Sequence, residues 1–543
     1  MITGDVKKIN LSISSFERMI TNGNLYIDKT RMIENFINGA SSVQLIARQR
    51  RLGKSLNMDM LRCFLSDKVD NRHLFKGLYI ETTQTWEMVN SAPVFYFNFK
   101  GLRIESYKEQ IFKQIDKNLS AYLNPEDLTG YLKRCYNGLL NNHEAVADGL
   151  FILTEIIFEI TGRRSYILID EYDKLLTDNF NTDHYSEIRA FETALFSSGL
   201  KDNPYLEKAL LTGVMRISHE SIMSGLNNLV TFDVFNDNIY MDDYGITNEE
   251  AAELSKLAAF DLDEAKLWYN GIKINGQAIY NIYSLLSYID KGRIDCFWGK
   301  SGTLDIIVSM LNDERKLALS KLLNGESVEV VVDDRISLKR LSGNAGDDAF
   351  YSLLVQSGYL ALNEQLPQKG TALLTIPNKE LLIVWKDFIL NNLYTGAVKV
   401  RTLFDNVDTL DVFTKDIEYF LCDRLSYHDL AVYNGQNEDK VKERVYHIFL
   451  LGILSAYDDV RYRYPRSNRE SGDGRYDVFV EKPGYNFIFE FKACSVKEDL
   501  DKVALDALKQ IVTKRYGADL DKTKRLIKVG IAFCGKQCQV KCN

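Results

Sequence analysis

Gly53-Lys54-Ser55 is a group of residues whose types and order suggest a specific chemistry. In a turn that leads from a strand into a helix, backbone N–H groups and the helix N-terminus hold phosphate groups. Lys54 would reach the β- and γ-phosphates of a nucleotide there, and the Ser55 hydroxyl would bind Mg²⁺. The general pattern has a glycine five residues before Gly53, where this sequence has Arg48. An ordinary helix start after a basic loop is therefore an open alternative.

Two carboxylates farther along the chain strengthen the case for a nucleotide site. Asp170 and Glu171 directly follow the apolar segment Tyr166–Ile169. In phosphate-loop ATPases, such an Asp holds Mg²⁺ and a polar residue nearby orients the attacking water, which is the role we expect for Glu171. Together with the Gly-Lys-Ser turn, this pair predicts ATP binding. Thr212 and Arg216 follow a third apolar segment, where they would sense the γ-phosphate or simply end a strand.

A second group of candidate catalytic residues lies near the C-terminus. Asp477 lies on the first of two apolar segments, and Glu490 and Lys492 lie at the end of the second. Glu490 and Lys492 are two residues apart, so they share one face of a strand. Two carboxylates suit Mg²⁺, which keeps several waters and binds phosphate oxygens. Lys492 would orient the attacking water and stabilise charge in the transition state. The alternative is an edge strand with an exposed ion pair.

Two predicted helices offer further residues to this second group. Glu443 precedes the hairpin and would add a metal-binding carboxylate, and His447 shares its helix face. Gln510 follows the hairpin and would contact substrate or water. For each of the three, a surface or helix-packing role is the alternative, and taken singly such residues more often have that role.

Short apolar segments alternate with helical segments around the first group of residues. We predict a helix over Leu56–Leu65 and strands over Val43–Ile46, Pro93–Phe99, Tyr166–Ile169 and Ala209–Leu211. This alternation indicates an α/β fold with a parallel sheet and crossover helices. From about Asn236 to about residue 400, and again over 405–455, the pattern is mostly helical.

The C-terminal segment predicts a hairpin around the second group of residues. Lys482-Pro483-Gly484 is a turn between the strands Tyr476–Val480 and Phe487–Phe491. A helix over Asp499–Tyr516 and a last strand over Ile527–Phe533 follow. Cys534, Cys538 and Cys542 then fall in a tail. We expect no zinc there, because a structural zinc site needs about four ligands.

Length and composition limit the class of protein. A chain of 543 residues corresponds to about three domains, and 45% hydrophobic and 26% charged residues are ordinary for globular proteins. The longest apolar runs are too short for a membrane helix, and the N-terminus lacks the apolar core of a signal peptide. We therefore predict a cytoplasmic protein without a membrane partner. Eight scattered cysteines do not suggest a disulfide framework.

The charge is unevenly distributed along the chain. The formal net charge is −8, which argues against general coating of nucleic acid. Residues 461–543, however, hold 18 Lys and Arg against 11 Asp and Glu, a net charge of +7. Arginines and tyrosines alternate at the start of this segment. It is either a phosphate-contacting surface or a solvated, charged hairpin.

Longer segments resemble a known family. They are Tyr26–Thr30, Leu45–Asn57, Ile169–Asp173, Leu211–Gly213, Arg216–Asn228, Tyr269–Gly271, Ser467–Asp477 and Phe489–Lys492. On these, the chain resembles, over nearly its full length, bacterial and archaeal AAA-ATPase-like proteins fused to a C-terminal PD-(D/E)XK nuclease-superfamily domain. The phosphate loop of that family is rich in arginine, so Arg48 fits it. Gln49 stands where the family often has proline.

The resemblance implies a domain order and a set of site residues. It implies a P-loop ATPase core over 1–235, a mostly helical lid or connector over 236–404, and a restriction-endonuclease-like α/β domain over 405–543. It also implies ATP and Mg²⁺ as cofactors and hydrolase activity at both sites. Arg51 joins Gly53, Lys54 and Ser55 as a nucleotide-binding residue, and Asp477, Glu490 and Lys492 match the nuclease motif.

Three functions are consistent with these residues. The first is an ATPase with a Mg²⁺-dependent nuclease that cleaves DNA, rather than RNA, under ATP control. The second is an ATP-gated switch that binds nucleic acid with little or no cleavage. The third is a regulatory scaffold that recognises a protein through its helical middle. A homo-oligomer is compatible with all three.

Overall fold

The computed structural model describes residues 2–216, 226–298, 307, 310–323, 325–333, 346–365, 370–392, 407–424, 466–467, 470–471, 473–482, 484–494, 499–518, 520, 523–534 and 537–543. The chain forms two compact units, and each unit combines two separate stretches of sequence. Unit 1 contains Met1–Gly299 and Val328–Leu381, and unit 2 contains Lys300–Ser327 and Leu382–Asn543.

A five-stranded sheet forms the centre of unit 1, with every neighbouring pair of strands parallel. Its spatial order is β4-β5-β6-β3-β7. The strands are β3 (Val43–Ala47), β4 (Val94–Asn98), β5 (Ser165–Asp170), β6 (Leu206–Gly213) and β7 (Leu229–Phe232). Every residue of β3 and β5 is buried, as expected for strands covered on both faces.

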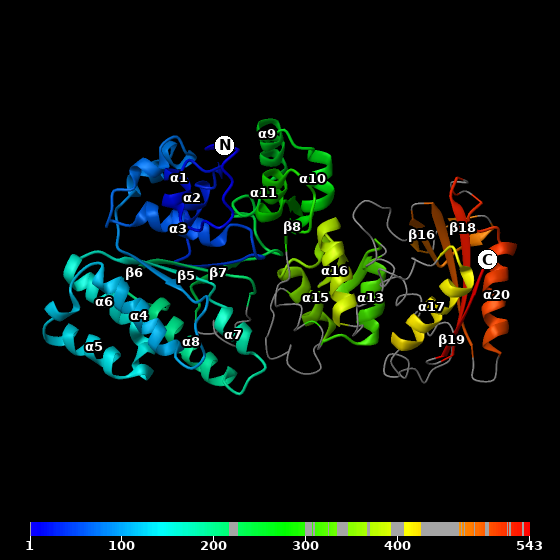
Figure 1. Ribbon diagram of the computed structural model, residues 1–543. Helices are drawn as coiled ribbons and strands as arrows, with labels where there is room; N and C mark the ends of the chain where they lie inside the picture. The colour runs from blue at the N-terminus through cyan, green and yellow to red at the C-terminus, as the bar shows by residue number, and fades with distance from the viewer. Residues whose placement is uncertain are drawn as a thin grey trace. The chain divides into compact units, whose positions relative to one another are not determined.

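Helices cover both faces of this sheet (Figure 1). One layer is α1 (Phe16–Thr21), α2 (Arg31–Asn38) and α3 (Lys54–Leu65). The other layer is α4 (Tyr107–Ser120), α5 (Gly130–Asn141), α6 (Gly149–Thr161), α7 (Lys174–Asn179) and α8 (Tyr185–Leu200). This is the α/β architecture that the alternation of apolar and helical segments predicts.

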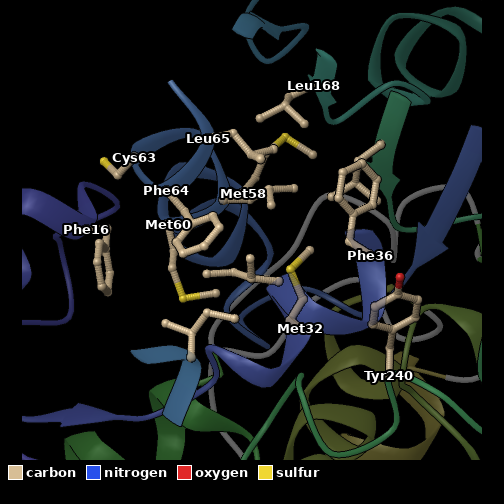
Figure 2. Close-up of a cluster of buried hydrophobic side chains, with 14 of the residues drawn as sticks. Phe16, Met32, Phe36, Met58, Met60, Cys63, Phe64, Leu65, Leu168 and Tyr240 are labelled. Carbon is tan, nitrogen blue, oxygen red and sulfur yellow. The ribbon is translucent and has the colours of Figure 1, made fainter. Parts of the chain in front are cut away.

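The core between the sheet and α1–α3 is rich in methionine and phenylalanine. Leu168 of β5 points towards Met58 and Leu65 of α3, and Met32 and Phe36 of α2 lie nearby (Figure 2). All five side chains are fully buried. This packing holds the start of α3, and with it the Gly-Lys-Ser turn, over the sheet.

Before the sheet in sequence, unit 1 has the short pair β1 (Ile2–Thr3) and β2 (Tyr26–Ile27), and further elements follow the sheet. These include α9 (Asn248–Ala258), α10 (Leu262–Tyr269), the hairpin β8 (Ile272–Ile274) and β9 (Gln277–Ile279), and α11 (Ile282–Lys291). A second, antiparallel sheet has the order β10-β12-β11 and packs with α15. Its elements are β10 (Val328–Val331), α15 (Asp347–Gln356), β11 (Ala361–Gln365) and β12 (Thr371–Thr375).

Unit 2 contains a five-stranded mixed sheet in the order β13-β16-β17-β18-β19. Among the described residues of this unit, the helices are α13 (Asp313–Leu323), most of α16 (Lys379–Asn392), α17 (Leu410–Arg424) and α20 (Leu500–Thr513). The strands are β13 (Arg466–Ser467), β16 (Val478–Lys482), β17 (Tyr485–Ala493), β18 (Arg525–Cys534) and β19 (Gln537–Cys542). β17 and β18 are parallel, with α20 as the crossover helix between them.

The predicted helix that carries Glu443 and His447 lies outside the described residues. The other predicted strands and helices around both groups of candidate residues are present, but three details differ. Asp477 directly precedes β16 instead of lying in the hairpin strand. The strand over Ile527–Phe533 is not the last, because β19 pairs with it and contains Cys538 and Cys542. Helices predominate in the described parts of 236–404, yet β8–β12 also lie there. Short strands without clear alternation escape a reading based on periodicity.

Candidate functional site

Lys54 is the first residue of α3 and lies folded against its own loop. Gly53 caps the helix with φ +90°, a conformation that favours glycine. The Lys54 Nζ donates hydrogen bonds of 2.8 Å to the carbonyl oxygens of Arg48 and Gln49. Burial lowers the pKa of Lys54 to about 8, although Asp170, Asp173 and Glu171 oppose this shift.

Asp170 joins two strands and the helix start through its carboxylate. The Ser55 hydroxyl donates to Asp170 Oδ2 at 2.6 Å, and the Thr212 hydroxyl donates to Oδ1 at 2.7 Å. Thr212 stands opposite Asp170 in the pairing of β5 with β6, which explains the second contact. The structure therefore brings together Ser55, Asp170 and Thr212, which the sequence indicated from three distant segments.

The acidic turn after β5 continues to a residue that the sequence analysis did not assign to the site. Glu171 has φ +55°, an unusual conformation for a residue with a side chain, at the edge where the strands end. Asp173 is buried and accepts hydrogen bonds from the backbone N–H groups of Val214 (2.9 Å) and Met215 (2.8 Å). Burial raises the pKa of Asp173, against these hydrogen bonds. Asp173 thus fixes the position of the backbone after β6. In the sequence, only its position two residues after Glu171 could have indicated that it belongs to this site.

Arg48 occupies the place of the usual glycine and is fully buried. Its guanidinium pairs with Asp237 and donates to the carbonyl oxygens of Ala47 (2.9 Å) and Phe232 (3.1 Å). The ring of Tyr244 lies 5.5 Å from the guanidinium carbon. Burial lowers the pKa of Arg48 to about 10. Arg48 therefore ties the phosphate loop to the end of β7, a role that its sequence position alone did not reveal.

Two other predicted nucleotide-binding residues contact protein groups. Arg51 lies 4.0 Å from the centre of the Tyr283 ring and donates to the Phe297 carbonyl at 2.6 Å. The Arg216 guanidinium pairs with Asp233 at 3.1 Å. Contact of Arg51 and Arg216 with a nucleotide stays a prediction.

The second group of residues lies at the β16–β17 hairpin. Val478 pairs with Phe489 at the end of the β16–β17 ladder, and Asp477 and Glu490 are the next residues on the two chain segments. Asp477 Oδ2 accepts a hydrogen bond of 2.8 Å from the backbone N–H of Phe491. Phe491 packs into the apolar core with Phe487 and Phe489, whereas Glu490 and Lys492 belong to the opposite face of β17.

Gln510 approaches this hairpin from α20. Its side-chain amide donates a hydrogen bond to Glu490 Oε1, and Glu490 is 4% exposed. Tyr516, which the sequence analysis did not assign, is buried nearby, and burial raises its pKa with further contributions from Glu490 and Asp477. Gln510 therefore contacts Glu490 at the hairpin, and its contact with substrate or water stays a prediction. Glu443 and His447 lie outside the described residues.

Both places offer oxygen donors suited to a hard cation. Asp170 with the Ser55 hydroxyl, and Asp477 with Glu490, match the donor types that Mg²⁺ prefers. In the described part of the chain, no three His, Cys, Asp or Glu side chains gather as a metal cluster. Among the same residues, no helix has the length and apolar character needed to cross a membrane.

Two protein-family models match the chain, and each covers one of the two candidate sites. The family model described as predicted AAA-ATPase matches residues 10–223, and the model of the PD-(D/E)XK nuclease superfamily matches residues 441–543. The chain therefore joins an AAA-ATPase-like domain to a PD-(D/E)XK nuclease-superfamily domain. The phosphate loop and Asp170 lie in the AAA-ATPase-like domain, and Asp477, Glu490 and Lys492 lie in the nuclease-superfamily domain.

One relative spans nearly the whole two-domain chain. It is a protein of Azotobacter chroococcum mcd 1, described as an uncharacterized protein in the vnfD 5′ region. It is 26% identical over 534 residues, which cover 94% of this chain and 93% of the relative.

Two solved structures are similar to parts of the chain. The Walker-type ATPase paby2304 of Pyrococcus abyssi has a TM-score of 0.31 and 16% identity, over 66% of this chain and 94% of its own. The ORC2 protein of Aeropyrum pernix has a TM-score of 0.32 and 11% identity, over 72% of this chain and 100% of its own.

Proposed function

We propose that the protein binds and hydrolyses ATP and cleaves DNA with its nuclease-superfamily domain under ATP control. The observation that carries this proposal is the contact of Gln510 with Glu490 at the hairpin, which also carries Asp477 and Lys492, within a PD-(D/E)XK match. The AAA-ATPase-like match and the Ser55–Asp170–Thr212 contacts support ATP binding in the same chain.

At the ATP site, each residue has a distinct proposed task. Lys54 would release the carbonyl oxygens of Arg48 and Gln49 and bind the β- and γ-phosphates. Ser55 and Asp170 would hold Mg²⁺, which neutralises phosphate charge when bound. Glu171 would orient the attacking water, and Thr212 would keep Asp170 in place. Arg51 and Arg216 would reach the nucleotide after leaving their present partners.

At the hairpin, the proposed chemistry is hydrolysis of a phosphodiester. Asp477 and Glu490 would hold Mg²⁺, which binds a phosphate oxygen and acidifies water when present. Lys492 would orient the attacking water and stabilise the negative charge of the transition state. Gln510 would keep the Glu490 carboxylate oriented, because it already donates to it.

The charge of the C-terminal segment supports nucleic acid as the substrate. Residues 461–543 carry a net charge of +7 in a chain whose formal net charge is −8. Contacts between basic side chains and phosphates supply most non-specific affinity for DNA. We propose that the nucleic acid is DNA rather than RNA. We also propose that the chain has three domains, divided at residues 235 and 404.

The test is cleavage of linear and circular, single- and double-stranded DNA with Mg²⁺, each with and without ATP. Wild type is compared with Lys492→Ala, Lys54→Ala and the control Lys509→Ala, an exposed lysine on α20. We expect ATP-stimulated cleavage by wild type and Lys509→Ala and none by the other two. Cleavage retained by both Lys492→Ala and Lys54→Ala would contradict the coupled model. Binding without cleavage in wild type would favour the ATP-gated switch.

A further inference from the structure

The turn that ends α15, residues 355–358, contacts both chain segments that border the candidate ATP site. On one side it meets Gln49 of the phosphate loop, and on the other it meets Arg216, beyond β6. The turn lies some 140 residues or more from either segment in sequence. We call residues 355–358 the α15 turn.

The contact with the phosphate loop depends on a glycine. The Gln49 side-chain amide donates to the Val355 carbonyl at 3.3 Å. Gly358 has φ +88°, and a Cβ added there would lie 2.8 Å from Gln49 Cγ. Such a separation is shorter than a carbon–carbon van der Waals contact. The backbone of the α15 turn therefore approaches Gln49 as closely as it does only because residue 358 has no side chain.

The contact with Arg216 depends on a buried amide. Gln356 Oε1 accepts a hydrogen bond of 2.9 Å from the backbone N–H of Arg216. Gln49 and Gln356 are 2% and 1% exposed. Burying an amide costs free energy unless its hydrogen bonds are made. Docking of the α15 turn provides partners for the Gln49 amide nitrogen and for Gln356 Oε1, whereas Gln49 Oε1 has none in the described part of the chain.

Gln49 also links the α15 turn to Lys54. Its carbonyl accepts a hydrogen bond from the Lys54 Nζ, while its side chain is held by Val355 and Gly358. A phosphate group that draws Lys54 away removes the support of the Gln49 carbonyl. The loop residue that must rearrange for phosphate binding is thus the residue that anchors the α15 turn.

We propose that the α15 turn is a latch that is released when ATP occupies the phosphate loop. This inference rests on the ATP binding proposed above. The docked turn stabilises the arrangement in which Lys54 binds its own loop, so docking and ATP binding oppose each other. Linkage requires the opposition to be reciprocal: ATP loosens the α15 turn, and loosening the α15 turn tightens ATP binding.

The test uses full-length Gly358→Ala, with Gly276→Ala as the matched control. Gly276 has φ +84° and nothing within 4 Å of an added Cβ, so both variants carry the same backbone strain but only Gly358→Ala pushes on Gln49. Gln356→Ala tests the latch a second time without changing a glycine. ATP affinity is measured by calorimetry, and hydrogen exchange is followed in peptides that cover residues 347–358.

We expect Gly358→Ala and Gln356→Ala to bind ATP about five-fold or more tightly than wild type, with Gly276→Ala unchanged. We also expect ATP to speed hydrogen exchange at residues 347–358 of wild type, and Gly358→Ala to show faster exchange without ATP. Weaker ATP binding by both latch variants would mean that the turn supports the loop and would overturn the latch. Normal ATP binding with unchanged exchange at 347–358 would overturn the latch but keep the ATP site. Absence of ATP binding in wild type would overturn both.

Discussion

Gly530 of β18 lies directly opposite Glu490 of β17 in their parallel pairing. A Cβ at Gly530 would lie 2.4 Å from the backbone nitrogen of Leu508 and 2.5 Å from the carbonyl oxygen of Ala504. Both atoms belong to α20, so the helix rests on the sheet at the one position beside Glu490 that has no side chain. This close approach sets the distance from which Gln510 reaches Glu490.

Gly530→Ala should therefore move α20 away from the sheet. The backbone atoms of α20 cannot yield as a flexible side chain would, and overpacking of this kind costs about 1–3 kcal/mol. We expect a lower melting temperature and a loss of cleavage, measured by scanning calorimetry and a nuclease assay. Gly138→Ala in α5, where nothing lies within 4 Å of an added Cβ, should not lower stability. Unchanged stability of Gly530→Ala would mean that α20 adjusts without cost.

Gln510→Ala should weaken cleavage without abolishing it. Gln510 donates to Glu490, which we propose as a metal-binding carboxylate, and loss of such a supporting contact typically costs about 10–100-fold. The readout is the cleavage rate as a function of Mg²⁺ concentration, in which the variant should need more Mg²⁺. Lys509→Ala, next to it on the exposed side of α20, should match wild type. A Mg²⁺ dependence identical to that of wild type would argue against this role of Gln510.

Lys54→Ala and Asp170→Asn should reduce ATP hydrolysis by about 100-fold or more, because each removes a charge directed at the phosphates or at Mg²⁺. The steady-state release of phosphate measures this rate. Lys76→Ala changes an exposed lysine outside the candidate sites and serves as the control. Hydrolysis at the wild-type rate in Lys54→Ala would remove the phosphate loop from the reaction.

The pH dependence of stability should depend on Glu380. Burial raises the pKa of Glu380 to about 7, although the backbone N–H groups of Trp298 and Phe297 and the charge of Arg51 oppose this shift. Between about pH 4.5 and pH 7, Glu380 is therefore protonated in the folded protein but ionised in the unfolded chain, where its pKa has the ordinary value of 4.5. The contribution is stabilising at low pH and is lost as the pH rises towards about 7.

Glu380→Gln should remove this part of the pH dependence, because a neutral amide still accepts the two N–H groups. Melting temperatures of wild type and variant are compared from about pH 5 to about pH 8. The melting temperature of the variant should rise relative to that of wild type as the pH increases towards 7. Above pH 7, the difference between the two melting temperatures should stay constant. Asp243, whose pKa burial also raises to about 7, contributes equally to both proteins. A constant difference across the whole range would contradict the shift at Glu380.

The sequence was sufficient for the elements that carry the candidate residues. Tyr166–Ile169 is an uninterrupted apolar run before the carboxylate of Asp170, and burial on both faces requires such a run. The hairpin around Gly484 followed from a turn between two apolar segments. Periodicity and turn chemistry act over a few residues, so a local reading recovers them.

Contacts between distant residues were beyond such a reading. The sequence marks Arg48 as a departure from the glycine pattern, but its partner Asp237 lies 189 residues away and is one acidic residue among many. Gln356 and Gly358 look ordinary in sequence, because their importance arises only where the α15 turn meets Gln49 and Arg216. The strand β19 was not predicted, because its own sequence pattern is weak and its pairing with β18 stabilises it.

The division of each unit into two stretches has a mechanical consequence. The chain passes between the units at residues 299–300, 327–328 and 381–382. A single proteolytic cut at any of these crossings leaves the units covalently joined through the other two. A truncation after residue 299 deprives unit 1 of Val328–Leu381, including the α15 turn, and one that begins at residue 382 deprives unit 2 of Lys300–Ser327. Separating the two proposed activities therefore calls for point substitutions in the whole chain rather than fragments.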